Sequence, residues 1–163
     1  MIKSLLIKRK LNASESNSPV SLGYLSVESI GLLFNEHQEP KSLEFLKNQF
    51  IADGKKIRTM MRVTKYEKNK SYDHPFFFQK DIGISGSIQS EVLAEFIQKP
   101  MDMLIVLDQE PDLLTSYVAS KCKGLKIGFY SELAPIQQLD LLVKPKNEST
   151  KYQELLEYVR KVA

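Results

Sequence analysis

The sequence has little of several features that would mark particular classes of protein. Cys122 is the only cysteine among 163 residues, so no intramolecular disulfide can form, which favours a reducing compartment. The longest apolar run, Met103–Leu107, is far too short to span a membrane. The N-terminal run Leu5–Ile7 leads directly into basic residues, which is not the pattern of a secretory signal. These absences predict a cytoplasmic protein in which Cys122 is a small buried apolar residue.

The sequence also lacks the motifs that bind phosphate or perform nucleophilic catalysis. Neither G-x-x-x-x-G-K-[ST] nor a G-x-G-x-x-G after the first predicted strand is present. His37 and His74 have no Cys or His at metal-ligand spacing, and no Ser-His-Asp order or nucleophile elbow is recognisable. The sequence therefore favours a non-catalytic protein without a cofactor.

What the chain does have is an uneven distribution of charge. The formal net charge is +3, from 23 Lys and Arg against 20 Asp and Glu. The N-terminal segment carries +4 before the first acidic residue, through Lys3, Lys8, Arg9 and Lys10. Residues 55–70 carry +6, and the cations to which we assign partner binding there are Lys55, Lys56, Arg58, Arg62 and Lys65. The rest of the chain therefore carries −7.

Two interpretations of the basic segments compete. If the leader lies against residues 55–70, the two form one basic face suited to a phosphate backbone or an anionic lipid. Tyr66 and Tyr72 would then be placed to stack on bases. Lysines on a half-polar strand also protect an exposed sheet edge from aggregation without any ligand. The first interpretation predicts a non-catalytic interaction module that docks on RNA, a ribonucleoprotein or an anionic surface.

The order of polar and apolar segments predicts a leader, a linker and one domain. Residues 1–12 are the basic leader, expected to be helical; residues 13–28 are a polar, turn-rich linker; residues 29–163 form a single α/β domain. Apolar runs alternate there with amphipathic helices, which is typical of βαβ units and a parallel sheet covered on both faces. We expect a three-layer α/β/α fold, flavodoxin-like or Rossmann-like, with a mainly parallel five-stranded sheet. The predicted strands are residues 29–34, 56–64, 103–107, 126–130 and 139–143.

The strands and helices differ in how clearly the sequence defines them. Met103–Leu107 is wholly apolar and predicts a central strand, whereas the half-polar segment 56–64 predicts an edge strand. The expected helices begin at Pro40, before Val92, at Pro111 and at the C-terminal apolar stripe that starts at Tyr152. Residues 65–89 follow no clear period, and we expect an extra short strand there near Phe76–Phe78.

Polar residues follow the predicted strands, at the edge where open parallel sheets bind ligands. Glu36 follows the first strand, Asp108 the central strand, Ser131 the fourth and Lys144 the fifth. This order resembles a response-regulator receiver domain. The resemblance implies that Asp108 accepts a phosphoryl group, that Glu36 and Asp108 hold Mg²⁺, and that Ser131 and Lys144 contact the phosphate.

The chain departs from the receiver pattern in two places. Asn35-Glu36 stands where receivers have a pair of acids, and the glycine expected a little beyond the acceptor aspartate is missing. The alternative prediction is therefore a receiver-like or nucleotide- or phosphate-binding domain that acts at the carboxyl ends of the strands.

Three segments carry a further resemblance, which covers most of the chain from Ser29 onward. Lys80–Gly83, Phe96–Ile105 and Ser120–Gly128 resemble an uncharacterised family of small bacterial proteins, frequent in Bacteroidetes and catalogued as domain of unknown function 6913. The lysine-rich N-terminal segment is also similar to the usual start of that family. The resemblance implies a small cytosolic α/β protein and supplies no activity and no catalytic residue.

Overall fold

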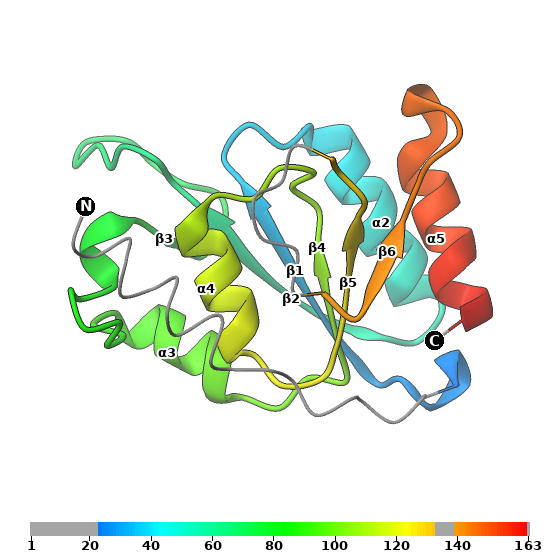
Figure 1. Ribbon diagram of the computed structural model, residues 1–163, viewed down its shortest axis with the longest axis horizontal. Coiled ribbons are helices and arrows are strands. Elements are labelled where there is room, and N and C mark those ends of the chain that lie inside the picture. The colour runs from blue at the N-terminus through cyan, green and yellow to red at the C-terminus, as the bar shows by residue number, and fades with distance from the viewer. Residues whose placement is uncertain (1–22, 133–138, 163) are drawn as a thin grey trace.

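The computed structural model describes residues 23–132 and 139–162 (Figure 1). The strands are β1 (Ser29–Asn35), β2 (Lys56–Arg62), β3 (Phe76–Phe77), β4 (Met103–Val106), β5 (Leu125–Phe129) and β6 (Leu141–Val143). The α-helices are α2 (Pro40–Ala52), α3 (Glu91–Gln98), α4 (Leu113–Lys121) and α5 (Lys151–Val162). Short 3₁₀ helices occupy η1 (Tyr24–Ser26), η2 (Gln79–Asp81) and η3 (Glu148–Thr150).

All six described strands pair in parallel, in the order β3-β2-β1-β4-β5-β6. This is the order of a Rossmann-type doubly wound sheet and differs from the flavodoxin order 2-1-3-4-5. The sheet has six strands instead of the predicted five, because the short strand expected near Phe76–Phe78 pairs with Met61 and Arg62 of β2. The prediction of that extra strand is confirmed, whereas the prediction of β2 as the edge strand is wrong, since β3 lies outside it.

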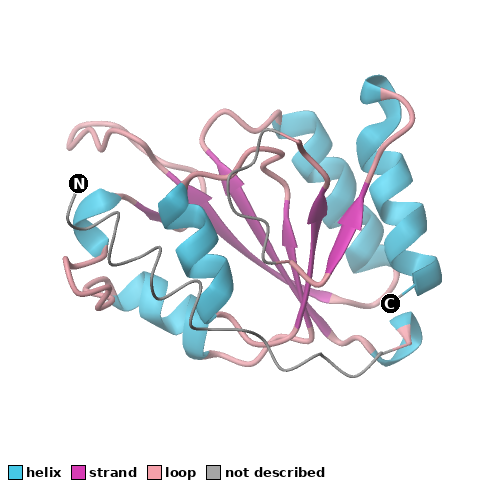
Figure 2. Cartoon of the chain, viewed as in Figure 1, coloured by secondary structure: helices cyan, strands magenta, loops and turns pink. Residues whose placement is uncertain are grey.

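The helices cover both faces of the sheet, which confirms the three-layer α/β/α architecture (Figure 2). Residues Ile30 and Leu32 of β1 pack in the same core as α2 and α5, whereas Leu33 packs in the core with α3 and α4. Successive residues of a strand point to opposite faces, so a strand buried on both sides must be apolar throughout. The MLIV run of β4 is buried at every position, as predicted for a central strand.

Helix ends follow local capping chemistry. The chain leaves α2 through Asp53 and Gly54, and Gly54 has φ +82°, a conformation that side-chain-bearing residues rarely adopt. Helix α4 begins at Leu113 and not at the predicted Pro111, because the Asp112 carboxylate accepts a hydrogen bond from the backbone N–H of Thr115 at 2.8 Å. The predicted boundary was therefore two residues early.

The last residues of the predicted linker pack against the body of the domain. Val27 is buried, and the Tyr24 hydroxyl donates a 2.6 Å hydrogen bond to Asp53. The leader and residues 13–22 lie outside the described residues. In the part of the chain that the structure describes, no helix has the length and apolar character needed to cross a membrane.

Candidate functional site

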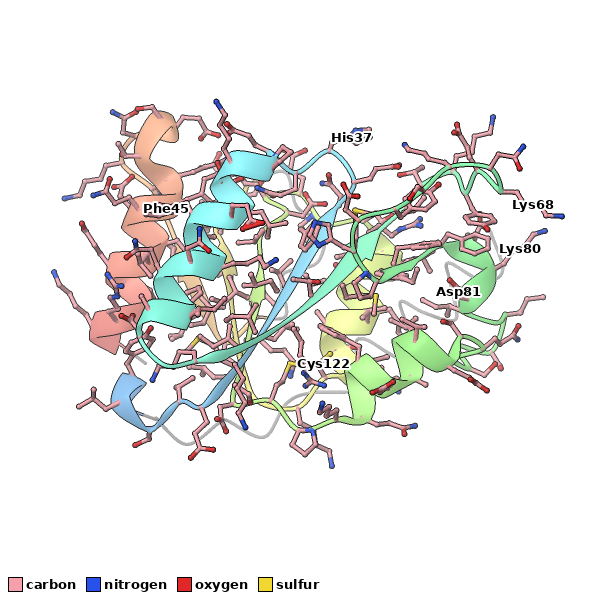
Figure 3. The ribbon with its side chains drawn as sticks, turned by 180° about the vertical axis from the view of Figure 1, so that it is seen from behind. His37, Phe45, Lys68, Lys80, Asp81 and Cys122 are labelled. Carbon is pink, nitrogen blue, oxygen red and sulfur yellow. The ribbon has the colours of Figure 1, made fainter. Side chains whose placement is uncertain are left out.

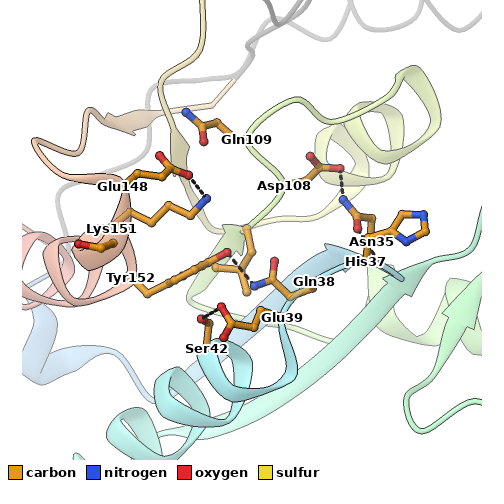
Figure 4. Close-up of a pocket in the computed structure, with 12 residues that line it drawn as sticks. Asn35, His37, Gln38, Glu39, Ser42, Asp108, Gln109, Glu148, Lys151 and Tyr152 are labelled. Atoms are coloured by element: carbon orange, nitrogen blue, oxygen red, sulfur yellow. Dashed lines mark hydrogen bonds and ion pairs between the residues drawn. The ribbon is translucent and has the colours of Figure 1, made fainter.

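A crevice of about 480 Å³ opens at the carboxyl ends of β1 and β4 (Figure 4). The two strands are neighbours in the sheet, but the chain leaves β1 for α2 on one face and leaves β4 for α4 on the other. Because the connections after these two neighbouring strands run to opposite faces, a gap is left at the edge of the sheet. This gap is the usual position of a ligand in open α/β sheets. The volume lies within the range of about 300–1,000 Å³ that is typical of small-molecule sites.

One wall of the crevice is a hydrogen-bonded pair across the two strands. The Asn35 side-chain amide donates to the Asp108 carboxylate at 2.9 Å, and the other Asp108 oxygen accepts the backbone N–H of Glu110 at 3.0 Å. Asn35 is fixed in turn, since its oxygen accepts the backbone N–H of His37 at 2.7 Å. Among the described residues no cation pairs with Asp108, and its half-buried carboxylate has acceptor positions beyond these two hydrogen bonds.

The opposite wall comes from η3 and the start of α5. Lys151 makes a 2.7 Å ion pair with Glu148, and the Tyr152 hydroxyl accepts a 2.8 Å hydrogen bond from the Gln38 amide. Burial alone would lower the pKa of Lys151, but the contact with the Glu148 carboxylate raises it above its ordinary value. Lys151 is therefore a permanent cation that is already neutralised by its neighbour.

The crevice is rich in hydrogen-bond acceptors and carries excess negative charge. Its carboxylates belong to Glu39, Asp108 and Glu148, and Lys151 is the only lysine among the described lining residues. The Ser42 hydroxyl donates to Glu39 at 3.0 Å, so this hydroxyl is occupied by a carboxylate and not by a histidine base. This arrangement is suited to binding a ligand that donates hydrogen bonds, and the same described residues offer no activated nucleophile.

Glu36 does not line the crevice. Its carboxylate accepts the backbone N–H of Thr64 at 3.0 Å, and its own N–H donates to the carbonyl of Arg62 at 3.0 Å. It lines a smaller cavity of about 200 Å³ together with Phe34, Tyr72 and His74 among others. Burial, with a contribution from Lys47, lowers the pKa of His74, whose ring meets Phe34 edge-on at 5.2 Å.

Of the receiver-like set, only Asp108 is among the described residues that line the crevice. Asp108 lines the crevice and Glu36 lines the smaller cavity, whereas Lys144 lines neither and places its ammonium group 5.3 Å from the centre of the Tyr130 ring. Ser131 is half-buried just before the gap in the described residues. Within residues 23–132 and 139–162, no three His, Cys, Asp or Glu side chains are grouped as a metal site requires.

The basic stretch is divided between the interior and the surface. Lys55 is 8% exposed, and its ammonium group donates to the carbonyl of Tyr24 at 2.7 Å and lies 4.3 Å from the centre of that ring. Arg62 is 7% exposed, pairs with Asp112 at 2.9 Å, donates to the carbonyl of Val63 and faces the ring of Phe77. These two cations hold the fold together.

Of the other three cations assigned to partner binding in this stretch, the two exposed lysines lie at opposite ends of β2. Arg58 is half-buried, donates to the carbonyls of Lys99 and Pro100, and lies over Phe96. Lys56 is exposed at the amino end of β2, and Lys65 is exposed beyond its carboxyl end. Seven strand residues span about 23 Å, so these two lysines cannot share one small patch. The leader cations Lys3, Lys8, Arg9 and Lys10 lie outside the described residues.

Several crevice residues were not singled out from the sequence. Tyr152 belongs to the predicted apolar stripe of the last helix, and Gln38 to a loop. The start of α5 lies opposite the β1–α2 loop only because of the strand order, and nothing in the sequence indicates that these two segments are in contact. Cys122, in contrast, is buried as predicted, and burial raises the pKa of its thiol to about 12.

A comparison with protein families matches nearly the whole chain. The matching family model is described as a family of unknown function (DUF6913), and the match covers residues 3–162. Comparisons with curated proteins and with solved structures gave no match.

Proposed function

The chain belongs to this family, whose description carries no activity, and we propose from the crevice geometry that the protein is a non-catalytic binding module for a small hydrogen-bond-donating ligand. The observation that carries the proposal is the cavity of about 480 Å³ at the carboxyl ends of β1 and β4, where the sheet order reverses. The single buried cysteine supports a reducing, cytoplasmic setting.

The side chains of the crevice favour hydroxyl or amino groups over phosphate. Ionised carboxylates only accept hydrogen bonds, so a ligand that fills this space must supply the donors. Phosphate would meet Glu39 and Asp108, whose charges repel it, and Lys151 is already paired with Glu148. The sequence also lacks the glycine-rich loop that cradles a phosphate with backbone N–H groups. We therefore propose an unphosphorylated polyol or amino sugar as the ligand, in place of the nucleotide or phosphate of the alternative prediction.

The proposal can be tested with three probes that share one sugar ring but differ in charge. ¹⁵N-labelled full-length protein is titrated with glucosamine, glucose and glucose 6-phosphate, and backbone chemical shifts are followed by NMR. We expect shifts that saturate at residues 35–42, 107–110 and 148–152 with glucosamine, a weaker response with glucose, and none with the phosphate ester. A separate titration with Mg²⁺ tests whether Asp108 holds the metal that the receiver-like alternative requires.

Asp108→Asn is the diagnostic variant, because it removes the charge and keeps one side-chain oxygen that can accept from Asn35, although its NH₂ group then replaces the acceptor of the Glu110 N–H. Removing the charge should weaken glucosamine binding by about tenfold, since charge-assisted hydrogen bonds are about twice as strong as neutral ones. Glu157→Gln is the matched control, because it removes one exposed α5 carboxylate that lies outside the crevice. The proposal is wrong if glucose 6-phosphate gives the strongest response in the crevice, or if Asp108→Asn binds like the wild-type protein.

A further inference from the structure

In the loop between β2 and β3, the ring of Tyr66 packs on three other aromatic rings. Tyr66 lies nearly parallel to Phe78 and Phe76, at interplanar angles of 20° and 18° and centroid distances of 4.8 and 5.7 Å. Phe76 and Phe78 are two residues apart in extended chain, so they point to the same side while Phe77 points into the core. Tyr66 therefore stacks on both rings, and 41% of the residue stays exposed.

The loop is held in this shape by its own contacts. Tyr72 packs on Phe76 at a centroid distance of 4.4 Å and stacks beside Tyr66 at 6.1 Å. Its hydroxyl accepts the backbone N–H of Glu67 at 3.1 Å, and the N–H of Lys70 donates to the Glu67 carbonyl to close a turn. A ring that is already fixed in the free protein loses little conformational freedom on binding, which favours affinity.

Three lysines lie in the same loop as this ring. Lys65, Lys68 and Lys70 are all exposed, and the structure pairs none of the three with a carboxylate of the described residues. Lys70 lies 5.5 Å from the centre of the Tyr72 ring, and Figure 3 shows Lys68 pointing outward at the end of the loop. Glu67 and Asp73 in the same loop reduce its net charge, so stacking must supply much of any binding energy.

We propose that this surface, Tyr66 with Lys65, Lys68 and Lys70, binds single-stranded nucleic acid. One base stacks on the exposed part of the Tyr66 ring, and the lysines contact the phosphates of the neighbouring nucleotides. Base–aromatic stacking combined with lysine contacts to the backbone is the common mode of sequence-tolerant single-strand binding. This site is separate from the crevice and does not depend on the ligand proposed for it.

The flat, ring-supported position of Tyr66 favours a base over a lipid headgroup as the partner. A lipid surface offers no planar ring to stack on, and membrane-binding surfaces present apolar side chains that enter the bilayer with their edges or tips. Anionic vesicles are nevertheless included in the test as the competing class of partner.

The test is fluorescence anisotropy of labelled uridine and thymidine oligomers of about ten nucleotides, with full-length protein at low salt. Tyr66→Leu keeps an apolar cover on Phe76 and Phe78 but removes the aromatic face, and it should weaken binding about tenfold. Tyr66→Phe keeps the ring and should stay within about twofold of wild type. Lys65→Gln with Lys68→Gln should weaken binding and reduce the slope of log K against log salt by about 1.4, or about 0.7 for each phosphate that is no longer neutralised.

Lys56→Gln is the matched control, because it removes an exposed lysine at the opposite end of β2. Urea unfolding of every variant establishes that the fold is retained. The proposal is overturned if the wild-type protein binds neither oligomer, if Tyr66→Leu binds like wild type because the basic leader carries the affinity, or if Lys56→Gln loses as much as the loop variants. It is also overturned if phosphatidylglycerol vesicles bind and the oligomers do not.

Discussion

Residues 55–70 contain cations of two kinds: some are buried and bond within the protein, and others are exposed to solvent. Lys55 and Arg62 are almost fully buried and each meets a carbonyl oxygen and an aromatic ring. Lys65 and Lys68 follow within six residues of Arg62 but lie in the loop beyond β2, exposed to solvent. The net charge of a segment therefore does not measure its binding surface, because some of its cations turn inward and donate to backbone carbonyls.

Among the substitutions of these cations, Arg62→Met should destabilise the protein most. The change keeps an apolar stem near Phe77 but removes the ion pair with Asp112 and leaves the Val63 carbonyl without its donor. Asp112 is half-exposed and can be hydrated, so the loss stays below that of a fully buried pair, at about 2–3 kcal/mol. Urea unfolding measures it. Lys65→Met is the control and should change stability by less than about 0.5 kcal/mol; equal losses in the two variants would refute the distinction.

Lys55→Met should have the next largest effect. The ammonium group of Lys55 bonds to the Tyr24 carbonyl and lies over the Tyr24 ring, so its removal loosens residues 23–28 from the body of the domain. We expect a loss of about 1–2 kcal/mol in the free energy of unfolding. Lys56→Met changes the adjacent, exposed lysine in the same way and should leave stability nearly unchanged. If the two variants lost similar amounts of unfolding free energy, the buried contacts of Lys55 would contribute nothing to stability.

A smaller effect is expected from acid. The hydrogen bond from Tyr24, followed by the bond from Arg160, lowers the pKa of Asp53 below its ordinary 3.8. Because the pKa is lower in the folded chain, the carboxylate stabilises the fold above about pH 4, and this contribution is lost as the pH falls through the folded-state pKa.

Wild-type protein should therefore lose more stability than Asp53→Asn between pH 5 and pH 3, measured by urea unfolding at each pH. Glu157→Gln removes an exposed carboxylate with no hydrogen-bond partner among the described residues, and it should follow the wild-type curve. If the unfolding free energies of wild type and Asp53→Asn fell equally between pH 5 and pH 3, the Tyr24–Asp53–Arg160 contacts would not be coupled to folding.

The candidate crevice was only partly predictable. Asp108 was singled out because an acid after a central apolar strand must arrive at the carboxyl edge of the sheet. Glu36 follows the neighbouring strand in the same way, yet its carboxylate accepts the backbone N–H of Thr64 and it does not line the crevice. The orientation of a loop side chain depends on which backbone donor lies nearest, and periodicity carries no information on that. Tyr152 and Gln38 meet across 114 positions of sequence, a contact that only the packing of α5 creates.

By itself, the sequence determined the α/β class, the central position of β4 and the burial of Cys122, because apolar runs and their spacing decide which segments must leave water. It also indicated the short strand at Phe76–Phe77, since so long a segment without structure is uncommon in a domain of this size. The strand order, the crevice between β1 and β4, and the division of the basic residues were decided only by tertiary structure. Each of these depends on which distant segments lie side by side, and local propensity does not encode that choice.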